Sequence, residues 1–339
     1  MVSLMISLLK RLAGKSKPLL ICYYVYENWR SLSNLKRGNR INKVGSRHSG
    51  MTITESLKYI DSVVDDYFSF LGLPRSHIIN KRILEIGPGD NLGVALIFLS
   101  EGASQVVCMD KFLTLGDPYR ETQIYRALRD RLDTPSKASF DEAIRLNEEI
   151  ECIPYKLRHI QGRGIDETKD SFQLEPFDLI LSRAVLEEIH EIDNAFFAMD
   201  RLLLPGGIMI HFIDLSDYRM FTDFGKHPLT FLTVPAFIYG LMSSYSCRPN
   251  RKRVNYYKNM MNSMGYEAKI VPLGVIGGIR RPHSHTRRSV LEPEHIKTAV
   301  SLVRMIRPKL GREFRFLPDD DLIPSGICLV AKKPAQGKG

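Results

Sequence analysis

The glycines Gly87, Gly89 and Gly93 and the acids Glu85 and Asp110 stand out in the stretch from Ile83 to Asp110, ILEIGPGDNLGVALIFLSEGASQVVCMD. An apolar run ends at Gly87 and Gly89, a segment with helical spacing follows, and a second apolar run ends at Asp110. Glycines allow positive φ and a close backbone approach to a ligand, and the helix start offers unpaired N–H groups. The order strand, glycine loop, helix is therefore typical of a nucleotide-binding site.

The acids beside this loop favour a cationic ligand over a phosphate. A dinucleotide-binding loop reads G-x-G-x-x-G. Here Gly87, Gly89 and Gly93 give G-x-G-x-x-x-G, with Leu92 where the third glycine would stand. Glu85 directly precedes the loop, and a carboxylate suits a cation better than it suits a pyrophosphate.

The segment EIGPGD resembles the first motif of the class I S-adenosylmethionine-dependent methyltransferases. FDLILSRAVLEEI and LLLPGGIMIHFIDL resemble the family's fourth-strand motif and its turn into the fifth strand. The resemblance covers roughly residues 80–272 and the last strand. It implies S-adenosylmethionine as cofactor, with Asp110 on the ribose hydroxyls and Asp166 on the adenine. The other implied cofactor-binding residues are Glu85, Gly87, Gly89 and Ser182.

Apolar strands that alternate with helices indicate an α/β fold with a parallel sheet covered on both faces. The strands expected from the pattern are Arg82–Ile86, Gln105–Met109, Leu157–Gln161, Phe177–Leu181, Gly207–Ile213, Glu267–Val271 and Gly326–Ala331. The resemblance implies a Rossmann-like seven-stranded sheet of order 3-2-1-4-5-7-6 with the last strand antiparallel. Helices are expected over 51–76, 92–100, most of 118–150, 193–204, 251–264 and about 293–310.

The expected organisation is a basic arm, a helical lead-in, one methyltransferase domain and a short tail. The boundaries are 1–50, 51–80, 81–332 and 333–339, with a lid or acceptor insertion at 214–250 and a second insertion at 273–324. The first insertion is rich in aromatic residues, and it predicts either a wall of the acceptor site or a filling of the core. The basic run from Arg248 to Arg253 predicts either a solvated helix start or contacts to a phosphate-bearing acceptor.

Methyl transfer to a hydroxyl needs a base, and acidic or histidine side chains beyond the fifth strand could supply one. The candidates are His211, Asp214 and Asp217. The two-residue period of a strand puts His211 and Asp214 on opposite faces. Asp214 stands at the strand end, whereas His211 could equally be a core histidine. His227, His283 and His285 are weaker candidates, and no cluster has metal-ligand spacing, so no metal is expected.

A longer set of segments resembles bacterial methyltransferases of surface-polysaccharide biosynthesis. These segments are GPGDNLGVALIFLSEGASQVVCMDKF, IYRAL, SRAVLEEI, HFIDLSDY, HPLTFL and NRKRVNYYKNMMNSMGYE. The resemblance implies a sugar or glycan acceptor, either free or linked to a nucleotide or lipid. One departure is that the fourth-strand motif reads Leu186-Glu187-Glu188 where the family often has Leu-Glu-His. A role of that histidine cannot be transferred, and His190 lies on another face. The open alternatives are an RNA or other small-molecule methyltransferase, and a cofactor-binding partner subunit without catalysis.

The basic charge of the chain is concentrated in the arm. Residues 1–50 carry +9 of the net +10, so the near-neutral body argues against a nucleic-acid partner. The arm alternates apolar and aromatic residues with basic ones, and it predicts either an interfacial helix on an anionic membrane or a helix packed on the fold. Five scattered cysteines fit a reducing compartment, so the expected location is the cytoplasm or the inner face of the membrane.

Overall fold

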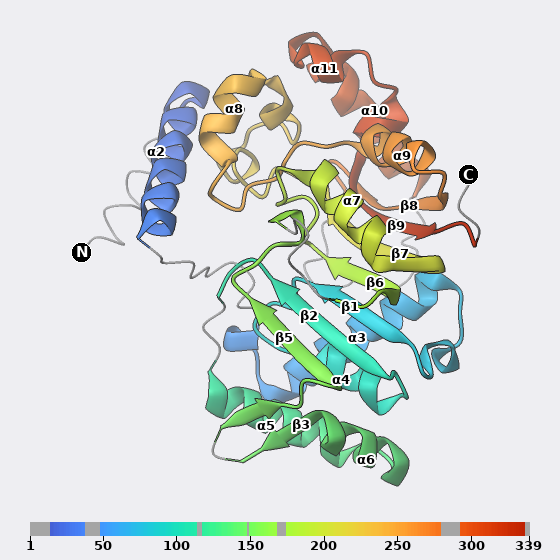
Figure 1. The fold of residues 1–339 in the computed structure, drawn as a ribbon. Coiled ribbons are helices and arrows are strands. Elements are labelled where there is room, and N and C mark those ends of the chain that lie inside the picture. Colours follow the sequence, from blue (N-terminus) through green and yellow to red (C-terminus); the bar gives the residue numbers. More distant parts are fainter. Residues whose placement is uncertain are drawn as a thin grey trace.

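A computed structural model describes residues 14–37, 48–113, 117–147, 149–167, 174–278 and 292–335. Its main feature is a seven-stranded sheet of order β5-β2-β1-β6-β7-β9-β8, shown in Figure 1. In chain order this is 3-2-1-4-5-7-6, so the expected Rossmann-like α/β fold is confirmed. The strands are β1 (Arg82–Ile86), β2 (Gln105–Asp110), β5 (Leu157–Gln161), β6 (Phe177–Arg183), β7 (Leu203–Asp214), β8 (Glu267–Val275) and β9 (Pro324–Lys332).

The strand directions leave one place where the order reverses. The strands β5, β2, β1, β6 and β7 are mutually parallel, and β9 is antiparallel to both β7 and β8. The chain runs outward from β1 through β2 to β5 and then returns to β6 on the other side of β1. Ligands of open parallel sheets bind beyond the carboxyl ends of the strands at such a switch point.

Helices cover both faces of the sheet, as expected. Side chains of α3 (Ile53–Leu71), α4 (Gly93–Ser100), α5 (Pro118–Asp130) and α6 (Thr134–Ala143) pack in one core with Ile83 and Val106. Side chains of α7 (Ile192–Leu202) and α9 (Val254–Ser263) pack in a second core with Leu84 and Val107. Because strand residues alternate between faces, neighbouring residues of β1 and β2 serve opposite cores.

The lead-in helix α3 starts at a capping box. The Thr52 hydroxyl accepts from the Glu55 N–H at 3.2 Å, and the Glu55 carboxylate accepts from the Thr52 N–H at 2.7 Å. The packing of α3 against α4 explains why Gly93 is a glycine. A Cβ on Gly93 would lie 2.4 Å from Cδ1 of Ile60, so α4 can approach α3 this closely only with glycine at its first position.

A third core lies outside the sheet and joins the arm to the insertions. In Figure 1, α2 (Lys17–Lys36) and α8 (Ala236–Ser243) lie side by side, with α10 (Pro293–Ile306) and α11 (Arg312–Arg315) beyond them. Leu20, Tyr23 and Tyr24 of α2 are buried in this core with Phe231 and Tyr239. The described part of the arm therefore packs on the fold with one side of its helix.

The basic run before α9 is internal. Arg253 donates to the carbonyls of Leu215, Leu322 and Pro324 at 2.6–2.8 Å and is 1% exposed. Arg251 is buried too, where it donates to the Val234 carbonyl at 2.6 Å. The expectation of a solvated or phosphate-binding run is wrong for these two arginines, because they donate to backbone carbonyls of the first insertion and of the segment that leads into β9.

The remaining elements differ from expectation in detail. Residues 118–150 include, besides α5 and α6, the strand β3 (Ile144–Leu146), which pairs antiparallel with β4 (Ile150–Cys152). The second insertion ends in α10, the short helices α11 and α12 (Asp319–Leu322), and β9. His283 and His285 lie outside the described residues.

Candidate functional site

The carboxyl ends of five parallel strands bring most of the candidate residues together. Glu85 is the next-to-last residue of β1, and Asp110 is the last residue of β2. Asp166 follows β5 in a 3₁₀ turn (Ile165–Glu167), and Asp214 ends β7. The predicted cofactor acids and the predicted acceptor acid thus share one edge of the sheet.

The glycine loop adopts the conformation that its residue types allow. Gly87 and Gly89 have φ of 70° and 76°, in the region that side chains disfavour. The backbone N–H of Gly89 donates to the Asp110 carboxylate, which also accepts from the Phe112 N–H at 2.9 Å. These bonds link the glycine loop to the end of β2.

Glu85 is a buried acid with a weak partner. Its Oε2 accepts from the thiol of Cys108 at 3.6 Å. Burial raises the pKa of Glu85 to about 7, and the thiol offsets only part of this effect. Burial also raises the pKa of Asp110, against the opposing effect of its two backbone donors. A cation that bound beside Glu85 would favour its ionised form.

Asp166 offers one occupied and one unoccupied carboxylate oxygen. Its Oδ2 accepts from Lys111 Nζ at 2.8 Å, while Oδ1 is buried without a partner. The Asp166 side chain is only 6% exposed. Because buried acceptors are nearly always satisfied in proteins, this oxygen is available to a hydrogen-bond donor of a ligand or a water.

Ser182 and His211 face each other across β6 and β7. The Ser182 hydroxyl lies 2.8 Å from His211 Nδ1, and both side chains are fully buried. Burial lowers the pKa of His211 to about 3, so the ring is neutral at ordinary pH. This placement matches the alternative of a core histidine that the sequence left open.

The two other predicted catalytic acids have different surroundings. Asp214 is half-buried, and its Oδ1 accepts from the Ser216 N–H at 2.7 Å. Asp217 accepts four bonds of 2.8–3.0 Å, from three backbone N–H groups and the Thr222 hydroxyl. Asp217 therefore closes the turn after β7, and both of its oxygens are occupied.

A cluster at the end of β6 was missed from the sequence. Glu187 is 1% exposed, and its Oε1 accepts from the Asp214 N–H at 3.0 Å and from the Tyr218 hydroxyl at 2.8 Å. Burial raises the pKa of Glu188 to about 8, opposed by hydrogen bonds with Tyr218 and Cys247 and reinforced by the Asp110 carboxylate. The sequence signal was the second acid that replaces the family histidine.

The remaining histidines do not join this cluster. Both ring nitrogens of His227 are engaged, with the Leu302 carbonyl at 3.0 Å and the Leu229 N–H at 3.1 Å. His190 lies within electrostatic range of Lys111 and Asp166. Its pKa is lowered by burial and, less, by the Lys111 charge. Over the described ranges, no three His, Cys, Asp or Glu side chains are grouped as a metal ion would require.

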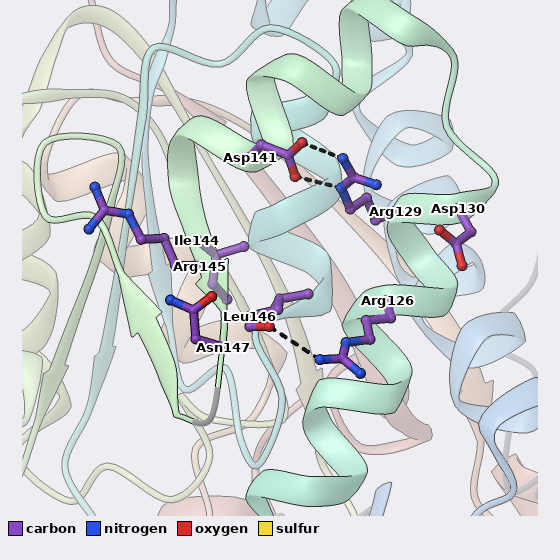
Figure 2. A pocket seen from close by; sticks show the side chains of 8 residues that line it. All are labelled: Arg126, Arg129, Asp130, Asp141, Ile144, Arg145, Leu146 and Asn147. Atoms are coloured by element: carbon purple, nitrogen blue, oxygen red, sulfur yellow. Dashed lines mark hydrogen bonds and ion pairs between the residues drawn. The ribbon is translucent and has the colours of Figure 1, made fainter.

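A cavity of about 480 Å³ lies elsewhere, between α5, α6 and β3, as Figure 2 shows. Arg129 there forms a bidentate pair with Asp141, and Arg126 donates to the Leu146 carbonyl at 3.3 Å. None of the predicted site residues lines it. The predicted site at the strand ends is therefore separate from this cavity.

Comparison with known proteins gives similarity of fold only. No protein-family model matches the chain, and no curated protein matches it. Solved structures that resemble it include phosphoethanolamine N-methyltransferase 2 of Haemonchus contortus in complex with S-adenosyl-L-methionine. That chain is 14% identical with a TM-score of 0.38, over 76% of this chain and 49% of that one. This chain thus spans about half the length of that enzyme.

Two further structures cover more of their own length. A putative sarcosine dimethylglycine methyltransferase from Galdieria sulphuraria is 10% identical over 80% of this chain and 86% of that one, with a TM-score of 0.42. A putative S-adenosylmethionine-dependent methyltransferase from Listeria monocytogenes is 14% identical over 81% and 98%, with a TM-score of 0.40. At these identities and TM-scores, the likeness is one of fold alone.

Proposed function

We propose that this protein is an S-adenosylmethionine-dependent methyltransferase that methylates a hydroxyl of a sugar or glycan. The observation that carries the proposal is the set of buried or half-buried carboxyl groups along the carboxyl ends of the parallel strands. Glu85 and Asp110 lie at the carboxyl ends of β1 and β2, and Asp166 and Glu188 lie in the segments after β5 and β6. Such a set suits a ligand rich in cationic, hydroxyl and amino groups.

The cofactor-side residues fit S-adenosylmethionine. The unpartnered Oδ1 of Asp166 suits the adenine amino group, and Asp110 suits the two ribose hydroxyls. Glu85, whose side chain accepts only from a thiol, suits the cationic end of the cofactor. Gly87 and Gly89 keep side chains away from the loop surface. S-adenosylmethionine would supply a methyl group on a positively charged sulfur.

The acceptor-side residues suit a hydroxyl that must lose its proton. A base works best when its pKa lies near the working pH. Glu188, with a pKa of about 8, meets this condition and lies within electrostatic range of Asp110. We assign the Glu188 carboxylate as the proton acceptor on this ground, although it also forms hydrogen bonds with Tyr218 and Cys247. Asp214 then contacts the acceptor from the end of β7.

The polar groups at this end of the site support the proposed acceptor class. Glu187, Glu188, Asp214 and the Tyr218 hydroxyl can all hydrogen-bond to sugar hydroxyls. A diphosphate carrier would need other cations, because Arg248 is paired with Glu27 at 2.9 Å and both Arg251 and Arg253 are internal. We also propose a cytoplasmic location, since none of the five cysteines, all of which are described residues, is paired in a disulfide.

Calorimetry with S-adenosylhomocysteine tests the cofactor assignment. Asp110→Asn and Asp166→Asn should each weaken binding about tenfold, as expected for a lost charge-assisted hydrogen bond of 1.5 kcal/mol or more. Asp141→Asn, which changes an ion pair on the far cavity, is the matched control and should bind normally. If S-adenosylhomocysteine does not bind the wild-type protein, the proposal is wrong. Transfer of labelled methyl groups to a panel of sugars tests the acceptor.

A further inference from the structure

The side of α2 that faces away from the third core is apolar and basic. Leu19, Cys22, Tyr26 and Trp29 are exposed and separated by three, four and three residues, so they line one side of the helix. Trp29, the single tryptophan of the chain, is 63% exposed and stacks on Tyr26 with ring centroids 6.3 Å apart. A stripe of apolar and aromatic side chains on a helix is usually buried, but this one is exposed to solvent.

The neighbouring helix α8 continues the same character. Phe237 is 79% exposed, and Leu241 and Tyr245 are 47% and 46% exposed. Asn28 fixes α2 to this segment. Its amide donates to the Leu241 carbonyl at 2.9 Å and accepts from the Tyr245 N–H at 2.7 Å. These two bonds hold α2 beside α8 and the residues just after it, and we call the exposed sides of these two helices, together with Tyr245, the α2/α8 surface.

The exposed charges on α2 and beside it are positive. Lys15, Arg30, Lys36 and Arg37 are exposed on or beside α2. Within α2 and α8, both described along their whole length, the only acid is Glu27. Its carboxylate is turned inward, where it accepts from Arg248 at 2.9 Å and from the Tyr23 hydroxyl at 2.6 Å. The surface thus presents aromatic and basic groups without an exposed acid on either helix.

We propose that the α2/α8 surface binds the face of an anionic lipid bilayer. Tryptophan and tyrosine favour the headgroup region, and basic side chains gain from anionic lipid. No helix in the described part of the chain is long and apolar enough to cross a bilayer, so the contact is peripheral. Not all apolar residues of α2 can contact the bilayer, because Leu20, Tyr23 and Tyr24 pack in the third core. The side that remains for the bilayer carries Leu19, Tyr26 and Trp29.

This surface stands independently of the proposed function, but it would place the lid near the bilayer. Ser243, the last residue of α8, hydrogen-bonds through its backbone to His190, and Cys247 just beyond it bonds to Glu188. If the methyltransferase proposal holds, an acceptor carried on a lipid would reach the strand ends from this side.

The fluorescence of Trp29 provides a direct test with the full chain. Vesicles of phosphatidylcholine with phosphatidylglycerol should shift its emission to the blue, and brominated lipid should quench it. Vesicles of phosphatidylcholine alone should do neither, and added salt should reverse the shift. An unchanged spectrum with anionic vesicles would overturn the proposal and leave another protein as the occupant. An equal shift with neutral vesicles would contradict it as well.

Matched variants separate this surface from the rest of the arm. Phe237→Ser should weaken vesicle binding about tenfold, from the lost burial of one aromatic ring. Phe316→Ser, at a ring that is 81% exposed elsewhere, should not. Arg30→Glu should weaken binding about fivefold or more, and Arg312→Glu should have no such effect. If Phe237→Ser and Arg30→Glu bind vesicles like wild type, the surface is not the docking site. Unchanged S-adenosylhomocysteine binding would separate these results from any failure of the cofactor site.

Discussion

Gly87 stands directly against Val185, so the cofactor loop and the segment after β6 leave no room for a side chain between them. A Cβ on Gly87 would lie 2.3 Å from Cγ2 of Val185. Gly87 also has φ of 70°. Two independent constraints therefore require glycine at this position, and neither involves the ligand. The sequence alone suggested the positive φ and a close approach to a ligand, but not the contact with Val185.

We expect Gly87→Ala to reduce both stability and cofactor binding. The positive φ should cost about 1–2 kcal/mol, and the contact with Val185 should add to it. Gly72→Ala is the matched control, because Gly72 has φ of 66° and nothing within 4 Å of its Cβ position. Val185→Ala combined with Gly87→Ala should recover part of the loss in urea denaturation. If the double variant is no better than the sum of the single ones, the contact does not limit the loop.

The burial of Glu85 predicts a pH-dependent stability. Its pKa rises from 4.5 in the unfolded chain to about 7 in the fold, so the folded state holds a proton that the unfolded state has lost between these values. Stability should therefore fall as pH rises from about 4.5 to 7, by up to about 3 kcal/mol.

Glu85→Gln should remove this dependence. The variant should be more stable than wild type near pH 8 and equal to it near pH 4, while its affinity for a cationic cofactor falls. Chemical denaturation at several pH values measures the first effect, and calorimetry measures the second. Glu267→Gln, at an exposed carboxyl, should leave the pH profile as in wild type. A wild-type profile in Glu85→Gln would show that Glu85 is not the group responsible.

The fold was largely predictable because its strands are short apolar runs with clear ends. The predicted bounds of β1 and β5 agree with the structure, and the sheet order follows from the resemblance. The hairpin of β3 and β4 was missed because each strand has only three residues, too few for its apolar alternation to be distinguished from a helical pattern. The reason for Gly93 was hidden too, because its constraint is Ile60, which is distant in sequence.

The site was predictable where strand ends define it and not where loops do. Glu85 and Asp110 follow from the register of β1 and β2, which any βαβ unit shares. Glu188 and Tyr218 lie in irregular segments, and Tyr218 has a positive φ of 50° that no periodicity reveals. His211 was ambiguous because a strand histidine reads the same whether it faces a ligand or the core. Only the burial of its ring distinguishes the two.

Arg253 should be essential for the attachment of the lid. Arg253→Met would leave three buried carbonyls, of Leu215, Leu322 and Pro324, without their donor. Each unsatisfied group costs about 1–3 kcal/mol, so the loss should be about 3 kcal/mol or more in urea denaturation. Arg253→Lys should retain part of the stability, and Arg312→Met at an exposed site should retain all of it. Wild-type stability of Arg253→Met would contradict this role.

The last prediction concerns the proton acceptor. If Glu188 must be ionised to accept the hydroxyl proton, kcat/KM should rise about tenfold per pH unit and level off above its pKa of about 8. The limb in kcat should lie at lower pH, because the positive charge of the bound cofactor favours the carboxylate. Glu188→Gln should lower kcat about 10²- to 10⁴-fold, abolish the limb and leave S-adenosylhomocysteine binding nearly unchanged.

Asp214→Asn should lower kcat but keep the limb, since Asp214 contacts the acceptor without taking its proton. If the limb vanishes in Asp214→Asn and persists in Glu188→Gln, the two roles are exchanged. If both variants turn over like wild type, neither carboxylate is the base, and the acceptor is a group that needs no deprotonation.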